Sequence, residues 1–237
     1  MNEDEVRCAV GLADSCELLS AAFAFPDEAL AAALADGSFR DDALACLSDA
    51  GAPEAARDRA DRCLEGFTGV DAAHFEGVLR KGHTILYLTP GNDVPVWPYE
   101  AAFRYTAENH QGAPSLFRSA RTLDVERHMR EAGVLPKNAR KEPSDSVWNE
   151  LSFLAYLYGN AAAAVQEGRV DDAETWRERA ARFWDEHASC WLPIFMDKTR
   201  EEAPRQTFGG EYAALATLGE LVLDEVGADI TRWKNRG

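Results

Sequence analysis

Histidine, cysteine and carboxylate side chains are the residues of this sequence that could bind a metal or perform acid–base chemistry. The five cysteines, at positions 8, 16, 46, 63 and 190, form no Cys-x-x-Cys pair and have no histidine at the spacing of a zinc site. The five histidines are scattered, and neither His-Glu-x-x-His nor the Glu-x-x-His pair of di-iron bundles occurs. The sequence therefore predicts no metal site and no bound cofactor, and we interpret the cysteines as reduced thiols.

The sequence also contains none of the common catalytic or phosphate-binding motifs. There is no Gly-x-x-x-x-Gly-Lys-Ser/Thr loop, no Gly-x-Gly-x-x-Gly after a strand, and no Gly-x-Ser-x-Gly elbow. Pairs of carboxylates are common because the chain has 41 acidic residues, so a single pair is weak support for catalysis. We expect a protein that is not an enzyme. A helical hydrolase or metal enzyme that uses scattered histidines and carboxylates is the alternative.

The charge of the chain is strongly negative, and this limits the class of partner. The 41 acidic and 25 basic residues give a formal net charge of −16. Such a surface repels phosphate backbones, so nucleic-acid binding is not expected, whereas a basic ligand would be attracted. The first sixty residues carry 13 acidic and 4 basic side chains. This concentration fits either a field for a basic ligand or a set of solvated helix faces.

The spacing of apolar residues predicts helices along almost the whole chain. Leu12, Cys16, Leu19 and Phe23 form one stripe, and Pro26 ends that helix. No alternating pattern predicts a strand. Further helices are expected over residues 27–35, 39–50, 54–67, 70–88, 99–108 and 115–132, from Ser144 onward, through residues 173–187, and from Gly209-Gly210. The prediction is one all-α domain over residues 1–237, with about ten helices, more than half of the chain helical, and no sheet.

Two irregular segments separate these helices. Residues 89–98 hold three prolines and a glycine, and residues 133–143 hold a glycine and two prolines. Long loops inside a compact domain are usually functional or are held against the core. We expect a hinge near residues 134–142.

Targeting signals are not evident in the sequence. No run approaches the roughly 20 apolar residues of a membrane span. The first residues are acidic, where a secretory signal would be basic. We therefore expect a cytoplasmic protein without stable membrane insertion.

Three segments, in order, resemble the TorD/DmsD/NarJ family. Lys141-Glu-Pro-Ser-Asp-Ser-Val-Trp-Asn-Glu-Leu-Ser-Phe resembles its Glu-Pro-x-Asp-His signature followed by Glu-Leu-x-Phe-Met, and Trp97-Pro-Tyr-Glu-Ala resembles its Pro-Tyr-Glu-Ser loop. Phe183-Trp-Asp-Glu-His187, followed by Trp191, is similar to a later family segment. The resemblance covers about residues 75–200. It departs at Ser146, where the family has histidine, and at Ala101, where the family has serine.

The resemblance implies an all-helical cytoplasmic chaperone for a molybdopterin oxidoreductase. Many members bind the twin-arginine leader of the enzyme's catalytic subunit, so the expected partners are that leader and that subunit. The family includes monomers and domain-swapped dimers, and no cofactor is implied. A NarJ-like assembly factor for an enzyme that is not exported is the main alternative. In a purely structural helical protein, the motifs would be coincidental.

The residues of the motifs also have structural interpretations. Pro143 ends the loop, and Ser144 or Asp145 can cap the next helix. Glu142 and Asp145 can instead receive arginines at the mouth of a groove, while Glu150 is either solvated or paired with an arginine. Trp97 and Tyr99 either hold the loop on the helices or contact a leader, and Trp148 and His187 are expected in the core. The predicted leader-binding residues are Trp97, Tyr99, Glu100, Glu142, Pro143, Asp145, Ser146 and Glu150.

Overall fold

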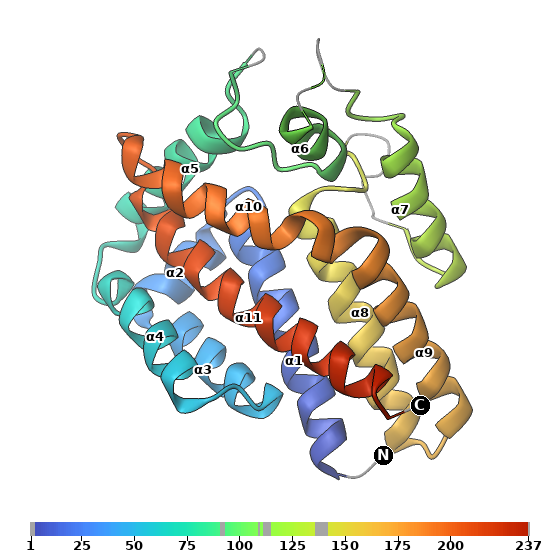
Figure 1. Cartoon of the computed structure of the whole chain (residues 1–237). Helices are drawn as coiled ribbons and strands as arrows, with labels where there is room; N and C mark the ends of the chain where they lie inside the picture. Colours follow the sequence, from blue (N-terminus) through green and yellow to red (C-terminus); the bar gives the residue numbers. More distant parts are fainter. Residues whose placement is uncertain (1–2, 91–92, 109, 111–114, 136–141, 237) are drawn as a thin grey trace.

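The computed structural model describes residues 3–90, 93–108, 110, 115–135 and 142–236, and in this part of the chain helices are joined by irregular segments (Figure 1). No sheet occurs among these residues, which hold one isolated bridge between Tyr99 and Ser146. The predicted all-α fold, with more than half of the chain helical, is confirmed. The α-helices are α1 Glu3–Phe23, α2 Glu28–Asp36, α3 Ser38–Ala50, α4 Glu54–Leu64, α5 Ala72–Tyr87, α6 Glu100–Ala107, α7 Ala120–Glu131, α8 Val147–Gln166, α9 Val170–Phe183, α10 Ser189–Glu202 and α11 Gly210–Lys234.

Local sequence signals set the ends of the first helices. Asp27 caps α2, since its side chain accepts a hydrogen bond from the Leu30 N–H. Gly37, with φ 89°, ends α2, and Gly51, with φ 88°, ends α3. A residue with a side chain rarely adopts this left-handed conformation, so glycine is the natural stop. Both predicted stops are confirmed.

Helix α1 lies at the centre of the packing. It contacts α8 along one side and α3 along another, while α8 also packs on α9 and α10 on α11 (Figure 1). The buried apolar residues form one continuous core from Ala9 in α1 to Ile230 in α11. Helices α6 and α7 lie together at one end of the molecule, next to the first residues of α8 (Figure 1).

A π-helix joins α9 to α10 without a loop. It covers Trp184–Ala188, and the backbone stays helical on both sides of it. A π-turn places more residues in each turn than an α-helix, so consecutive side chains diverge less around the axis. Glu186 and His187 both lie in this wider turn. Such π-bulges are common at functional sites.

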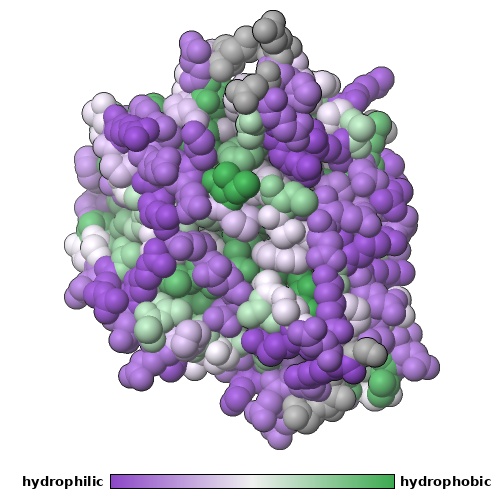
Figure 2. Space-filling view, viewed as in Figure 1, coloured by the Kyte–Doolittle hydropathy of each residue, from purple (hydrophilic) through white to green (hydrophobic). Residues whose placement is uncertain are grey.

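The predicted hinge lies mainly outside the described part of the chain. Residues 136–141 are not described, while residues 134, 135 and 142 border them. The single-domain organisation and the hinge near residues 134–142 stay predictions. The face of the molecule in Figure 2 is largely hydrophilic, with hydrophobic side chains gathered near its middle.

Among the described residues, no single helix is both long and apolar enough to cross a membrane. Helices α1 and α2 are long and apolar enough only when they are taken together, and they are bent by 116° relative to each other.

Gly11 permits the close approach of α1 and α3, and its substitution tests this packing. A Cβ atom at Gly11 would lie 2.7 Å from the Cys46 carbonyl oxygen and would also clash with the Ala50 nitrogen. We expect Gly11→Ala to lower the free energy of unfolding by about 1–3 kcal/mol, the usual cost of overpacking. Gly159→Ala is the matched control, because a Cβ in the middle of α8 meets no atom within 4 Å. Urea unfolding of Gly159→Ala should show a free energy of unfolding about 0.5–1 kcal/mol higher than that of wild type. Equal changes in the free energy of unfolding for Gly11→Ala and Gly159→Ala would contradict the close approach of α1 and α3 as the cause.

Candidate functional site

The two segments that carry the main motifs are joined through their backbones. The Glu100 N–H donates to the Asp145 carbonyl oxygen at 2.8 Å, and the Val147 N–H donates to the Pro98 carbonyl oxygen at 2.9 Å. Together with the Tyr99–Ser146 bridge, these bonds hold the end of the loop at residues 89–98 against the residues that precede α8. The motifs, far apart in sequence, therefore form one structure.

Asp145 caps α6 rather than the helix that follows it. Its Oδ2 atom accepts from the Ala101 N–H at 2.9 Å, while its carbonyl accepts from Glu100. The first two N–H groups of α6, which have no partner inside the helix, are both satisfied in this way. The resulting bond also brings the negative charge of Asp145 to the positive end of α6.

The predicted cap of α8 is wrong. Neither Ser144 nor Asp145 caps it: α8 begins at Val147, and the Ser146 Oγ accepts from the Asn149 N–H at 3.3 Å. The Ser144 hydroxyl instead points to Glu126 Oε1, at 3.3 Å. The physical reason is that Asp145 is already used by α6. Ser146, which replaces the family's histidine, is thus a structural cap here.

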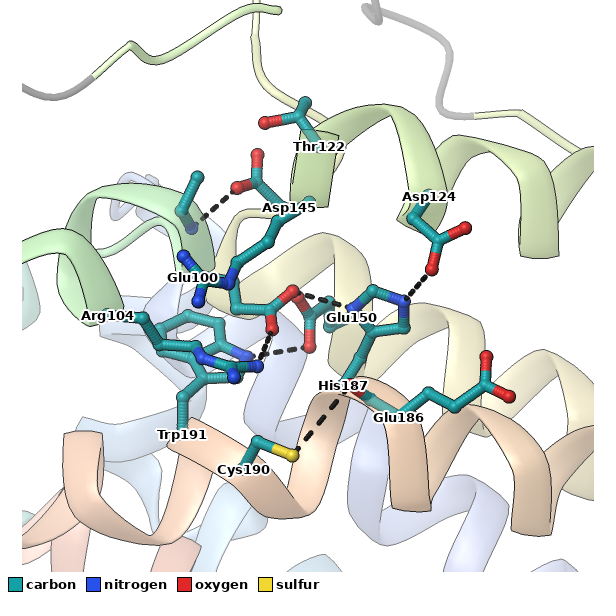
Figure 3. A network of polar contacts seen from close by, with 12 residues as sticks. Glu100, Arg104, Thr122, Asp124, Asp145, Glu150, Glu186, His187, Cys190 and Trp191 are labelled. Atoms are coloured by element: carbon teal, nitrogen blue, oxygen red, sulfur yellow. Dashed lines mark hydrogen bonds and ion pairs between the residues drawn. The ribbon is translucent and has the colours of Figure 1, made fainter. Parts of the chain in front are cut away.

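Three carboxylates form a buried cluster beneath the junction of the motifs. Figure 3 shows Glu100, Asp145 and Glu150 near one another, and none of the three has exposed surface. Glu100 accepts from Arg104 Nη1 at 2.8 Å and lies 2.7 Å from His187 Nδ1. The Arg104 guanidinium and the His187 imidazole therefore both contact the Glu100 carboxylate.

Glu150 is bound by an indole from α10. Its Oε2 atom accepts from Trp191 Nε1 at 2.8 Å, while Oε1 has no hydrogen-bond partner in the described part of the chain. The predicted solvation of Glu150 is wrong, because α8 turns this side chain towards α10. Arg104 lies close enough to favour its charged form, but the hydrogen-bond partner of Glu150 is Trp191. A buried acceptor without a partner is costly.

Burial changes the proton affinity of this cluster. Desolvation raises the pKa of Asp145 to about 6, although the Ala101 N–H and Thr122 favour its charged form. Desolvation, followed by the charge of Glu100, raises the pKa of Glu150 well above its ordinary value. Loss of hydration penalises the ionised form of both groups. Both carboxyl groups therefore hold a proton more tightly than they would in water.

The other predicted site residues form a half-buried rim. Trp97, Tyr99 and Glu142 are partly exposed, while Pro143 is buried. The Tyr99 ring packs edge-on against Trp148, with centroids 5.9 Å apart. Burial raises the pKa of Glu142, and a hydrogen bond with Trp148 partly opposes this shift. Burial also raises the pKa of Tyr99 to about 12, assisted by the charges of Glu142 and Asp145.

A small groove opens beside this rim, between α7 and the first turns of α8. Its volume is about 210 Å³. Asn149, at its edge, donates through Nδ2 to the Pro143 carbonyl at 3.1 Å, so the groove adjoins the Glu142-Pro143 segment. Leu135 is about half exposed here. The groove is lined by Met129, Val134, Leu135, Asn149, Ser152, Phe153 and Tyr156.

A larger acidic groove lies elsewhere, between α1 and α3. Its volume is about 470 Å³, and exposed carboxylates surround an apolar floor. This groove explains part of the negative charge of the first sixty residues. Its acidic side chains are Asp14, Glu17, Asp42 and Asp49.

Sequence reasoning missed a second cluster of polar groups on the outer side of Glu100. As predicted, His187 is buried and satisfied: its Nδ1 faces Glu100, and its Nε2 lies 3.2 Å from Asp124 Oδ2. His128 and Glu186 complete this cluster, and the four side chains could hold a metal ion. The sequence feature that could have predicted part of this cluster is the i, i+4 spacing of Asp124 and His128, which places them on one helix face.

Asp145 variants separate its capping role from its charge. Asp145→Asn keeps an acceptor for the Ala101 N–H, whereas Asp145→Ala removes it and should be about 1–2 kcal/mol less stable than Asp145→Asn at pH 7. The folded state binds the Asp145 proton more tightly than the unfolded state, so this group lowers stability as pH rises from about 4 to 6. Asp145→Asn does not titrate, so it avoids this loss of stability. Its free energy of unfolding should rise by roughly 1–3 kcal/mol relative to wild type between about pH 4 and 6.

Urea unfolding of the three proteins between pH 4 and 7 is the measurement. The quantity compared is the difference in the free energy of unfolding between Asp145→Asn and wild type. Burial lowers the pKa of His83 to about 4, so His83 makes stability rise with pH in this range. His83 is present in both proteins, so its contribution cancels in the difference. If the difference in the free energy of unfolding stays constant with pH, the pKa of Asp145 is not raised in the folded state.

Comparisons with known proteins agree with the motifs. The family model for the nitrate reductase delta subunit matches residues 54–197, more than half of the chain. The selenate reductase assembly chaperone of Thauera selenatis is 42% identical over 82 residues, and the chlorate reductase assembly chaperone of Ideonella dechloratans is 40% identical over 82 residues. Each of these matches covers 35% of this chain and 39% of the relative.

A solved structure shows a weaker likeness. The crystal structure of a protein assigned as a redox enzyme maturation protein from Archaeoglobus fulgidus covers 90% of this chain and 93% of its own, with 19% identity and a TM-score of 0.46. The match of the family model, over the same residues that carry the motifs, identifies the family. The chain belongs to the nitrate reductase delta subunit family, which comprises assembly chaperones of the NarJ and TorD type rather than enzymes.

Proposed function

We propose that this protein is a cytoplasmic chaperone that binds the twin-arginine leader of a molybdopterin oxidoreductase and its catalytic subunit before cofactor insertion. One observation carries the proposal: the two family motifs meet at a carboxylate cluster whose rim combines an acid with aromatic side chains. A twin-arginine leader is basic and then apolar, so it needs both kinds of contact. The assembly roles in the names of the two relatives support this proposal.

Glu142 is the first contact for an arginine. It is partly exposed, and its pKa is raised because burial has removed part of its hydration. A guanidinium could form two parallel hydrogen bonds with such a carboxylate. Trp97 and Tyr99 lie on the same rim and offer apolar surface to the methylene groups of the arginine.

The buried carboxylates require the rim to open. Asp145 and Glu150 have no exposed surface, so a leader reaches them only if the backbone bonds between the motifs separate. The Oε1 atom of Glu150, which has no partner among the described residues, would gain a donor from a guanidinium. We therefore propose two steps, in which Glu142 binds first and the interior carboxylates engage after opening.

The groove between α7 and α8 suits the apolar part of the leader. It lies directly beside Glu142-Pro143 and is lined by Met129, Phe153 and the half-exposed Leu135. Methionine adapts its shape to different apolar ligands. An arginine on Glu142 would place the following apolar residues of the leader at this groove.

A second candidate function is assembly of a molybdoenzyme that is not exported. The description of the matching family, the nitrate reductase delta subunit, favours it. The two functions differ in what the chaperone recognises. Co-purification of a client with and without its leader distinguishes them, because an assembly factor of the second kind retains the leaderless client.

Substitution of Glu142 tests the leader site. Glu142→Gln removes one partly desolvated charge and keeps the acceptor for Trp148, so stability should not fall. The affinity for a synthetic twin-arginine leader should fall about five- to thirtyfold, or roughly 1–2 kcal/mol. Isothermal titration calorimetry measures this affinity.

Asp42→Asn is the matched control, since it removes the same charge from an exposed position in the groove between α1 and α3. It should change affinity less than about twofold. A larger loss from Asp42→Asn than from Glu142→Gln would instead place the leader in that acidic groove.

Salt dependence tests the electrostatic part of the proposal. Arginines that meet a protein of net charge −16 are attracted over a distance set by the Debye length, about 10 Å at 0.1 M salt. Leader affinity should therefore fall steeply between about 0.05 and 0.5 M NaCl. Titrations with a peptide whose arginine pair is replaced by glutamine should show a much weaker dependence. Equal slopes for the two peptides would contradict recognition of the arginine pair.

A further inference from the structure

Four side chains with metal-binding groups converge where α7 meets the π-helix. Asp124 and His128 lie one turn apart on α7, and Glu186 and His187 are consecutive in the π-helix. One ligand atom from each residue lies within 4.8 Å of those of the other three. The wider π-turn explains how two adjacent residues reach the same neighbour. Figure 3 shows Asp124 and His187 facing each other from the two helices.

The geometry forms two pairs of an imidazole and a carboxylate. His128 Nε2 lies 2.8 Å from Glu186 Oε2, and His187 Nε2 lies 3.2 Å from Asp124 Oδ2. The two imidazole rings are almost perpendicular, with centroids 5.2 Å apart. The histidine side chains are buried, whereas about 40% of each carboxylate side chain is exposed. An ion from solvent would therefore reach the site past the carboxylates.

A buried carboxylate orients His187 towards the cluster. Glu100 Oε2 lies 2.7 Å from His187 Nδ1, and Glu100 itself has no exposed surface. A carboxylate in this position favours the proton on Nδ1 and leaves Nε2 as the ligand atom. Metal-binding histidines almost always have such a partner on their second nitrogen.

A cationic side chain already lies against three of the four groups. Arg127 Nε donates to Asp124 Oδ1 at 2.7 Å, and Arg127 Nη2 lies 3.3 Å from His128 Nε2 and 3.6 Å from Glu186 Oε2. Arg127 is about half exposed, so it can turn into solvent without unfolding the helix. A second cation, Arg182, lies 3.5 Å from His128 Nδ1 and also pairs with Glu131.

We propose that Asp124, His128, Glu186 and His187 bind one Zn²⁺ ion in exchange for the Arg127 guanidinium. Two imidazole nitrogens and two carboxylate oxygens suit four-coordinate Zn²⁺. Mg²⁺ and Ca²⁺ prefer oxygen ligands alone and should bind weakly. The ion would fix α7 to the junction of α9 and α10, next to Glu100 of the candidate site. This inference is independent of the proposed client.

Zinc titration of the whole protein tests the inference. Competition with a chromophoric chelator should show one Zn²⁺ per chain, and Co²⁺ should give the visible absorption of a four-coordinate site. His128→Asn and His187→Asn should each lower affinity more than about 100-fold. His187→Asn keeps a donor for Glu100, so a fall in its zinc affinity is due to the missing Nε2 ligand atom. Glu100→Gln should lower affinity roughly 10- to 100-fold.

Two further variants make the test specific. Arg127→Gln should raise zinc affinity about tenfold, because it removes the competing cation while leaving all four ligands. His110→Asn is the control, since this exposed histidine lies outside the cluster and should not affect affinity. Circular dichroism of each variant checks folding. No one-to-one binding by wild type at micromolar Zn²⁺, or equal affinity of wild type and His128→Asn, would overturn the proposal.

Discussion

Asp145 supplies the acceptors for the start of a helix that begins 45 residues before it, and the arrangement of the site depends on these bonds. Its carbonyl and its carboxylate satisfy the first two N–H groups of α6. Without them, the end of the loop at residues 89–98 would lose its attachment to the segment before α8. Glu100, the first residue of α6, would also lose its fixed place beneath the motifs. Its contacts with Arg104 and His187 follow from that placement.

The buried carboxylates of this site are tolerated because hydrogen-bond partners offset part of their lost hydration. Arg104 and His187 contact Glu100, and the first N–H groups of α6 donate to Asp145. The Trp191 indole donates to Glu150. Protonation relieves part of the remaining penalty, as the raised pKa values of Asp145 and Glu150 indicate. Buried ionisable groups usually stabilise less than apolar groups of the same volume would. The proposed recognition of a cationic leader would give these carboxylates a role beyond stability.

The sequence alone was sufficient for most of the fold, because helix ends depend on neighbours in the chain. Gly37 and Gly51 mark helix stops through their own conformation, and the apolar stripe of α1 is visible as a pattern. The π-helix at Trp184–Ala188 was not predicted, since no local rule identifies it. The motifs identified the residues of the candidate site but not their partners. Which N–H group Asp145 reaches is decided by tertiary contact.

The same limit applies to the histidines. The burial of His187 could be inferred from its place on an apolar stripe, whereas its position between Glu100 and Asp124 could not. These three residues come from different helices, and their meeting depends on how α6, α7 and the π-helix pack. Spacing of i, i+4 pairs Asp124 with His128 on one helix, but it does not predict the second pair on another.

The cap provided by Asp145 also has a consequence for the order of folding. During synthesis, α6 leaves the ribosome well before Asp145 and has no other acceptor for its first N–H groups among the described residues. The chain from Pro98 to Val147 must therefore close as one loop before α6 is complete. Closing a loop of this length costs entropy before the contacts that stabilise it are formed. We therefore expect helices α1 to α5 to form their local turns before the site, which needs α8 in place.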